Sequence, residues 1–197
     1  YYDILTARGF GGPYLYCEDN ERMPEYISAF DKEFDRFCLE NNIIAEYIKF
    51  DPWENLIDGL GDIYEIVPHG ILICNNVKTN FFEDQYSSKL RQNIRKAVKN
   101  QVHVEFDFKG DTIRDFLRMY KNTEERYKVS DYYKFDSDFI KRYFEILRGN
   151  VCIAHAVYQD RLISSALFVW GEDIFHYHIS GNDPQYMQYQ GNSLLLY

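Results

Sequence analysis

Two histidines separated by one residue are the side chains in this sequence best placed for proton transfer. His176 and His178 lie in the run Phe-His-Tyr-His-Ile, which is typical of a β-strand, and alternate residues of a strand face the same side. Such a pair could ligate a metal, but no third ligand is evident in the sequence. Packed or cleft-lining imidazoles are the simplest interpretation, and acid–base catalysis is the functional one. We expect Tyr177, which points the opposite way, to lie in the core.

A cationic helix face is the second candidate site. Residues 85–104 carry five basic residues and no acidic one. Arg91 and Arg95 lie four residues apart, so they share one face of a helix, and Lys99 continues it. Two guanidinium groups can hold a phosphate through forked hydrogen bonds. A solvated helix face, or ion pairs with the acidic first part of the chain, explains the same pattern without a ligand.

Aromatic residues are unusually frequent, at 18% of the sequence, with 18 Tyr and 15 Phe. Tyrosine combines an apolar body with a polar tip, which suits half-wet clefts and interfaces. Tyr132 and Tyr133 follow Asp131, between two expected helices. They either line a cleft that holds the acceptor or cover a junction between helices.

Charge and length restrict the classes of function. The 197 residues carry a net charge of −9, and residues 1–80 hold 15 acidic against 6 basic residues, whereas 81–197 balance. An acidic chain is a poor general nucleic-acid binder, because phosphate attraction needs a positive surface. No run approaches ~18 consecutive apolar residues, so no membrane span is expected. The length suits one large domain or two small ones.

The cysteines indicate a reducing compartment. None of them forms a Cys-x-x-Cys pair, and a chain of this length does not depend on a disulfide framework. Each stands among apolar neighbours, so we expect buried thiols at all four positions, Cys17, Cys38, Cys74 and Cys152.

Residues 1–80 read as a mixture of strands and one long helix. Apolar residues recur every three or four positions over 24–41, which predicts a helix with one buried face. The sequence predicts strands over 1–5 and 43–50, with Asp51-Pro52 ending the second. It also predicts a hairpin formed by 63–67 and 70–77 around Pro68-His69.

Residues 81–197 have a clearer order. Helical periodicity covers 84–100 and 112–128, and a further helix begins after Asp136 and ends at Gly149. We expect Asp111 to cap the helix at 112–128, and an alternating strand to occupy 102–108.

Three strands follow one another near the end of the sequence. The strands at 151–158, 161–170 and 173–180 are joined by links of two residues, which forces antiparallel neighbours and a three-strand meander. After a loop at 181–190, Asn192 or Ser193 reads as the cap of a helix that the sequence leaves unfinished. We therefore expect a piece of a longer protein, truncated at both ends.

The order strand, helix, helix, meander, loop, helix resembles the front of a GNAT acyltransferase domain. Several segments resemble the Fem-like branch, the peptidoglycan interpeptide bridge-forming aminoacyltransferases. These segments are Gly9–Pro13, Ile48–Pro52 with Asn55, Leu90–Ala97, Tyr120 with Thr123 and Arg126, and His176–His178 leading to Gly191-Asn192. The resemblance implies an α+β, GNAT-like fold with a mixed, mostly antiparallel sheet flanked by helices. It further implies two partial tandem units, with 1–80 ending the first and 81–197 beginning the second.

The resemblance also implies roles for particular residues. In this superfamily the donor's phosphates lie at a helix start after the central strands, where backbone N–H groups are unpaired. Gln190, Gly191 and Asn192 occupy that position, with one glycine where CoA-using members have a glycine-rich loop, whereas Fem enzymes use aminoacyl-tRNA. Arg126 corresponds to a substrate-facing position, although a cation in a last helical turn is also favourable without a ligand.

These observations together predict a cytoplasmic enzyme that transfers an acyl or aminoacyl group to an amine on a cell-envelope or similar precursor. The donor would be acyl-CoA or aminoacyl-tRNA, and no permanently bound cofactor or metal is expected. The amine would attack the bound ester directly, since no Ser-His-Asp or Cys-His arrangement is visible. The alternative is a non-catalytic glycan- or peptide-binding module that keeps the fold.

Overall fold

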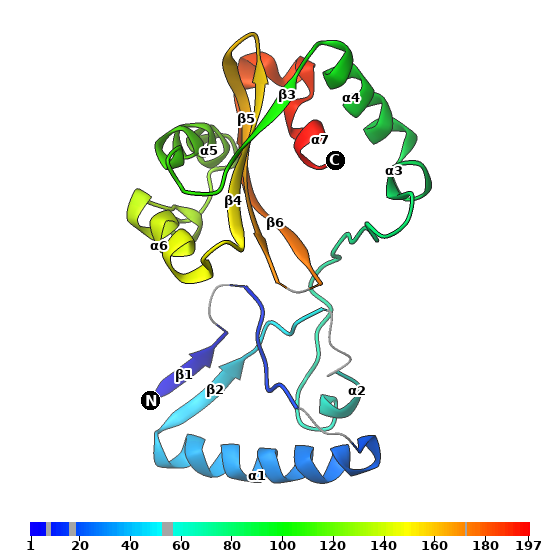
Figure 1. Ribbon diagram of the computed structural model, residues 1–197. Coiled ribbons are helices and arrows are strands. Elements are labelled where there is room, and N and C mark those ends of the chain that lie inside the picture. Colours follow the sequence, from blue (N-terminus) through cyan, green and yellow to red (C-terminus); the bar gives the residue numbers. More distant parts are fainter. Residues whose placement is uncertain (7–8, 16–18, 53–56, 172) are drawn as a thin grey trace. The chain divides into compact units, whose positions relative to one another are not determined.

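The computed structural model describes residues 1–6, 9–15, 19–52, 57–171 and 173–197. The described chain divides into two units, Tyr1–Cys74 and Asn75–Tyr197 (Figure 1). Asn55, one of the residues that carry the family resemblance, lies outside the described residues. The assignment of the two units as tandem acyltransferase domains stays a prediction.

The first unit is a strand–helix–strand arrangement. Strand β1 (Tyr2–Leu5) pairs in parallel with β2 (Ile43–Tyr47), and helix α1 (Met23–Glu40) connects them after a short 3-10 turn, η1 (Asn20–Arg22). A four-residue helix, α2 (Ile57–Leu60), follows. Parallel strands need such a crossover, and the predicted helix at 24–41 supplies it.

The hairpin predicted at 63–67 and 70–77 is wrong. The structure has no strand among residues 61–80, and the apolar side chains of Val67, Ile71 and Ile73 are exposed. Pro68 lacks an N–H group, and no neighbouring strand is available among the described residues to complete a ladder.

The prediction of buried thiols is confirmed for Cys152 alone. Cys38 is half-buried and Cys74 is exposed, so the prediction is wrong for Cys74, and Cys17 lies outside the described residues. Burial, with a smaller contribution from Asp107, raises the pKa of the Cys152 thiol to about 11.

The second unit is built on a four-stranded antiparallel sheet with the order β3-β4-β5-β6. Its strands are β3 (His103–Asp107), β4 (Val151–Tyr158), β5 (Arg161–Trp170) and β6 (Phe175–Asn182). The last three form the predicted meander. Its helices are α3 (Phe81–Asp84), α4 (Ser88–Lys99), α5 (Ile113–Tyr127), α6 (Ser137–Leu147) and α7 (Gly191–Leu195), with 3-10 turns η2 (Asp131–Tyr133) and η3 (Pro184–Tyr189).

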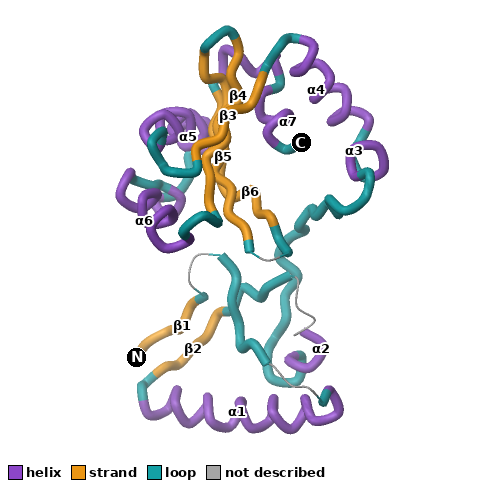
Figure 2. Tube along the Cα trace, viewed as in Figure 1, coloured by secondary structure: helices purple, strands orange, loops and turns teal. Residues whose placement is uncertain are grey.

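Helices cover both faces of this sheet. Helices α5 and α6 pack on one face, where Phe116, Ile140 and Leu167 are fully buried, and α4 and α7 pack on the other (Figure 2). Ala97 and Leu195 represent the second core. The prediction of an α+β fold with a mostly antiparallel sheet flanked by helices is confirmed.

Helix α5 lies unusually close to β6. A Cβ atom at Gly181 would stand 2.2 Å from the backbone carbonyl carbon of Met119, so only glycine fits there. Two side chains of α5 also bond to β6 carbonyls: Thr123 Oγ1 donates to Ser180 O at 3.0 Å, and Asn122 Nδ2 donates to Asn182 O at 3.0 Å. The backbones are therefore held together on either side of the contact.

The N-terminal caps of the helices in the second unit agree only in part with the predicted ones. Asp136 caps α6 as predicted, because its carboxylate accepts the Phe139 N–H at 2.7 Å. Asp111 does not cap α5, since the N-cap residue is Thr112, whose hydroxyl is bonded elsewhere. Helix α7 begins one residue before the predicted caps, with Gln190 at its N-cap.

Candidate functional site

Strand β6 carries a β-bulge at His178. In β5, Leu167 pairs with Ile179 and the next residue, Phe168, pairs with Tyr177, so His178 is an extra residue without a partner. A bulge sets two residues against one on the neighbouring strand and re-aims the side chains around it. The irregularity therefore falls at one of the two histidines that the sequence singles out.

The two imidazole rings lie next to each other, as the alternation of a strand predicts. The ring centroids of His176 and His178 are 5.5 Å apart. Tyr143 of α6 holds the second ring, with its hydroxyl oxygen 3.0 Å from His178 Nε2. His178 is partly buried, whereas His176 is exposed.

Both histidines are neutral at pH 7. Desolvation, with a smaller contribution from His176, lowers the pKa of His178 to about 4. Desolvation also lowers the pKa of His176. A neutral imidazole has one nitrogen lone pair that can accept a proton, so the exposed His176 is the better placed of the two to act on a ligand.

Tyr177 connects the histidine pair to the start of α7. Its ring packs into the core on the opposite face of the sheet, as expected. Its hydroxyl donates to Asn192 Oδ1 at 2.9 Å. Because a tyrosine has one hydroxyl proton, the same oxygen accepts the bond from the Ser180 hydroxyl. Asn192, predicted to contact the donor, is thereby brought to the strand that carries the histidines.

The segment before Asn192 has a strained and closely packed backbone. Gln190 has a φ of 62°, and its amide nitrogen donates to Met187 O at 3.1 Å. Gly191 is buried, and a Cβ atom there would stand 3.0 Å from a side-chain carbon of Ile163. The glycine therefore allows α7 to start directly against β5.

Two other predicted binding residues, Arg126 and Tyr133, contact other parts of the second unit. Arg126 is exposed at the end of α5, with Nη1 3.4 Å from Met187 Sδ, which places it beside the turn that leads to Gln190. Tyr133 is half-exposed and meets Tyr132 edge to face, at a centroid distance of 5.0 Å. Its backbone carbonyl accepts the Tyr120 hydroxyl at 2.8 Å, which ties this turn to α5.

Arg91 and Arg95 share one helix face as predicted, and both contact Glu83. Arg95 Nη2 lies 2.9 Å from Glu83 Oε1, and Arg91 Nε lies 3.5 Å from Glu83 Oε2. Arg91 Nη1 also donates to the carbonyls of Glu83 and Tyr86, at 2.8 and 2.6 Å. The acidic partner therefore comes from the neighbouring α3, within the same unit.

A buried polar chain that sequence reasoning missed crosses the α5 face of the sheet. Burial acts to raise the pKa of Asp107, but the bonds that its carboxylate accepts from the Thr112 hydroxyl and from the backbone N–H groups of Thr112, Lys109 and Gly110 lower it. Asp107 Oδ2 accepts the Thr112 hydroxyl at 2.6 Å. The hydroxyl oxygen lies 2.8 Å from His155 Nε2, and since its proton points to Asp107, it must accept from the imidazole.

This assignment places the proton of His155 on Nε2 and leaves a lone pair on Nδ1. His155 is 6% exposed, and its Nδ1 has no hydrogen-bond partner. Ser165, the cross-strand partner of His155, is fully buried with an equally unpaired hydroxyl. A histidine inside the apolar run of β4 was the sequence signal for this network.

Metal-binding clusters and membrane-spanning helices are both absent from the described ranges. No group of three or more His, Cys, Asp and Glu side chains is arranged there to hold a metal ion. In the same residues, no helix combines the length and the apolar character needed to span a bilayer.

Comparison with known proteins adds one match. The family described as acetyltransferase (GNAT) domain matches residues 85–197, which is more than half of the chain. A search of curated proteins gave no match. The matched segment contains the four-stranded sheet, both histidines and α7.

Proposed function

The chain belongs to the acetyltransferase (GNAT) domain family, and on this premise we propose that it is an N-acyltransferase, which moves an acyl group from an activated ester or thioester to an amine. The observation that carries the proposal is the antiparallel sheet whose last described strand, β6, is bulged at a histidine. An edge strand presents unpaired N–H groups. Such groups can stabilise the negative charge that develops on the acyl oxygen.

The proposed reaction needs no covalent enzyme intermediate. The amine nitrogen attacks the acyl carbon, the bond from that carbon to the sulfur or oxygen of the donor breaks, and the amine loses a proton. The protein contributes orientation, oxyanion stabilisation and a proton acceptor. The thiol of Cys152 is buried and protonated at neutral pH, so it is unsuited to act as a nucleophile.

We assign the proton transfer to the histidine pair. His176 is exposed and neutral at pH 7, so it can take the proton that the amine loses. His178 lies behind it, bonded to Tyr143 and kept uncharged by desolvation. Because His178 is uncharged, a protonated His176 is not destabilised by repulsion from a second positive charge.

The finer assignments rest on the family resemblance. We propose a Fem-like enzyme of the cytoplasm whose donor is acyl-CoA or aminoacyl-tRNA, held at Gln190, Gly191 and Asn192. The acceptor is proposed to be an amine on a cell-envelope precursor. The bond from Tyr177 to Asn192 supports this, because it links the proposed donor segment to the histidine strand.

We further propose substrate contacts at Arg126, Tyr133, Arg91 and Arg95. Arg126 has the stronger support, because it lies beside Met187, just before the proposed donor segment. Binding of a phosphate by Arg91 and Arg95 requires the ligand to replace Glu83, which pairs with both.

The test is transfer by the purified chain from acetyl-CoA and, separately, from aminoacyl-tRNA to a panel of primary amines. We expect His176→Gln to lower kcat/KM by about 10²- to 10⁴-fold, the range of general base catalysis. His69→Gln, which changes an exposed histidine of the first unit, is the matched control.

The pH profile distinguishes a base from a merely structural residue. Because desolvation lowers the pKa of His176, the native protein should keep its activity down to a pH below 6.5 and lose it only when His176 becomes protonated. This fall in activity at acidic pH should be missing from the pH profile of His176→Gln. Turnover with neither donor would contradict the proposal and favour the non-catalytic binding module. Equal activity of His176→Gln and His69→Gln would remove His176 from the mechanism.

A further inference from the structure

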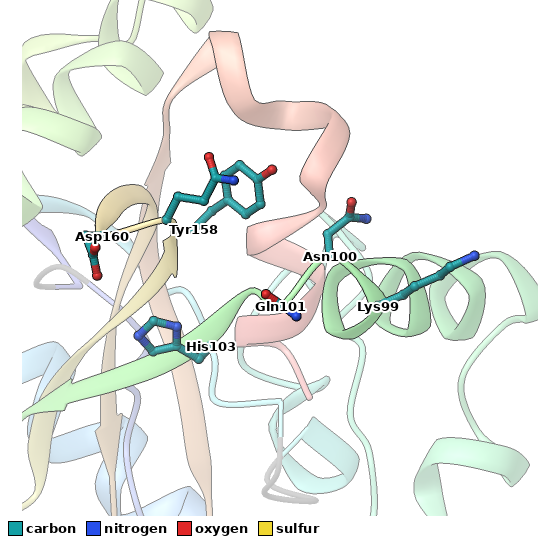
Figure 3. Close-up of a pocket in the computed structure, with 7 residues that line it drawn as sticks. Lys99, Asn100, Gln101, His103, Tyr158 and Asp160 are labelled. Carbon is teal, nitrogen blue, oxygen red and sulfur yellow. The ribbon is translucent and has the colours of Figure 1, made fainter.

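A polar pocket opens at the end of the sheet where the β4–β5 turn meets the end of α4 (Figure 3). Its volume is about 350 Å³, which lies at the small end of the range of ligand sites. Three amide side chains line it: Asn100, Gln101 and Gln159. We call it the turn pocket. Gln101 and Gln159 each offer hydrogen-bond donors and an acceptor. Asn100 Nδ2 already donates to Lys96 O at 2.7 Å, which leaves its second N–H and its amide oxygen, so the lining matches a ligand that both donates and accepts.

The charges around the turn pocket are balanced. Lys99 contributes a cation and Asp160 an anion, and both line the cavity. His103 lines it as well and already faces Glu105, with 3.3 Å between Nε2 and Oε1. A phosphate would meet the carboxylate of Asp160 without a cluster of cations to offset it. The lining therefore favours an uncharged ligand.

One aromatic wall completes the pocket. The ring of Tyr158 lies between the β4–β5 turn and the end of α4 (Figure 3). Tyr189 stacks on this ring at a centroid distance of 4.0 Å and fixes its orientation. A fixed tyrosine ring provides an apolar surface for the C–H groups of a ligand, while the amides bond to its polar groups.

The backbone of the pocket is strained at three positions. Gln101, Gln159 and Asp160 have φ values of 61°, 49° and 57°, and they are three of the seven described non-glycine residues with positive φ. Glycine is favoured in this conformation, and a two-residue turn with both φ values positive usually contains Asn-Gly. Three side chains therefore stand at the pocket in positions where glycine would give a more stable backbone.

From these features we infer that the turn pocket binds a neutral sugar. Hydroxyl groups both donate and accept hydrogen bonds, which matches the amides, and a sugar ring presents C–H groups to Tyr158. The balanced charge of Lys99 and Asp160 suits an uncharged ligand of this kind.

The turn pocket is separate from the histidine pair. The pocket adjoins Arg161 at the start of β5, whereas His176 pairs with Val169 near the other end of that strand. Eight residues of extended strand span about 26 Å. The inference therefore goes beyond the proposed acyl transfer and does not depend on it.

The test is binding of maltotriose, cellotriose and chitotriose to the purified chain, followed by NMR and by calorimetry. Adenosine and AMP serve as nucleoside and nucleotide probes. We expect at least one of the sugars to bind and to shift the resonances of Gln101 and Gln159. Binding of AMP or adenosine in place of the sugars, or of none of the three sugars, would overturn the inference.

The strained positions allow variants that remove ligand contacts without weakening the fold. Gln101→Gly and Asp160→Gly relieve a positive φ, so we expect an unchanged or higher Tm together with at least about tenfold weaker sugar binding. Lys128→Gly is the matched control, because Lys128 has a φ of 49° in the same unit but caps α5 away from the pocket. Sugar binding that is equally strong in all three variants would refute the assignment to this pocket.

Discussion

Replacing Thr112 by valine tests the hydrogen-bond assignment in the buried chain from Asp107 to His155. Valine has nearly the shape of threonine but lacks the hydroxyl that donates to Asp107 and accepts from His155. Asp107 keeps its three backbone donors after the change. His155 Nε2 loses its partner inside the protein, where the residue is 6% exposed.

The expected loss follows from these contacts. A buried donor left unpaired costs about 1–3 kcal/mol, and a hydrogen bond to a charged group contributes about 1.5–3 kcal/mol. Since the Asp107 carboxylate stays largely satisfied, we expect Thr112→Val to lower the free energy of unfolding by about 3 kcal/mol. For a unit of this size the same change lowers Tm by about 10 °C.

Urea unfolding of Thr112→Val and of Thr112→Ser measures the effect, because serine keeps the hydroxyl and should lose much less. The ¹⁵N chemical shifts of His155 report the tautomer directly, and we expect the proton on Nε2 in the native protein. A proton on Nδ1, or a loss below about 0.5 kcal/mol for the valine variant, would refute the assignment.

Three further predictions follow from the packing and charges of the second unit. Gly181→Ala should destabilise the fold by about 3 kcal/mol or more, because the added Cβ would overlap the backbone of Met119. Gly171→Ala is the control: a Cβ there would meet no atom within 4 Å, so thermal unfolding should be nearly unchanged. Acidification from about pH 6.5 to pH 4 should lower the free energy of unfolding, because His178 takes up a proton in the unfolded chain but not in the native protein, where its pKa is about 4. Urea titrations at a series of pH values should show a shallower decline of this free energy for His178→Gln. An unchanged decline in the variant would contradict the lowered pKa. Asp136→Ala should cost about 1 kcal/mol by loss of the α6 cap, with Asp136→Asn close to the native protein in the same titration.

Local rules predicted most elements of the second unit. The meander follows from two short links, which leave adjacent strands no arrangement except an antiparallel one. The third strand begins at Phe175, two residues later than predicted, so the second link has four residues and not two. Helix α6 follows from its apolar period and the capping side chain of Asp136. The helix face shared by Arg91 and Arg95 follows from spacing alone.

Features that depend on distant partners were not readable from the sequence. Asp111 does not cap α5, because the N–H group and the hydroxyl of Thr112 at the start of the helix both bond to Asp107 of β3. The partner of Arg91 and Arg95 is Glu83, which a turn between α3 and α4 brings onto the same helix face. The apolar segment at 63–77 has the composition of strands but no adjacent strand among the described residues.

In the candidate site, too, local features were predictable from the sequence and features set by distant partners were not. Alternation along the strand placed His176 and His178 on one side, and the structure agrees. The bulge at His178 is set by the register between β5 and β6, which no local pattern in the sequence encodes. His155 was overlooked because its neighbours in β4 read as an ordinary buried strand, and its partners come from the β3–α5 connection.

The bulge in β6 also bears on self-association. A long, regular strand at the margin of a sheet can recruit the same strand from another molecule and begin a continuous intermolecular ladder. The extra residue at His178 interrupts the regular spacing that such a ladder requires. At the opposite margin, β3 has five residues, with His103 and Glu105 exposed. Of the residues described, the sheet therefore offers other copies of the protein one irregular margin and one short margin.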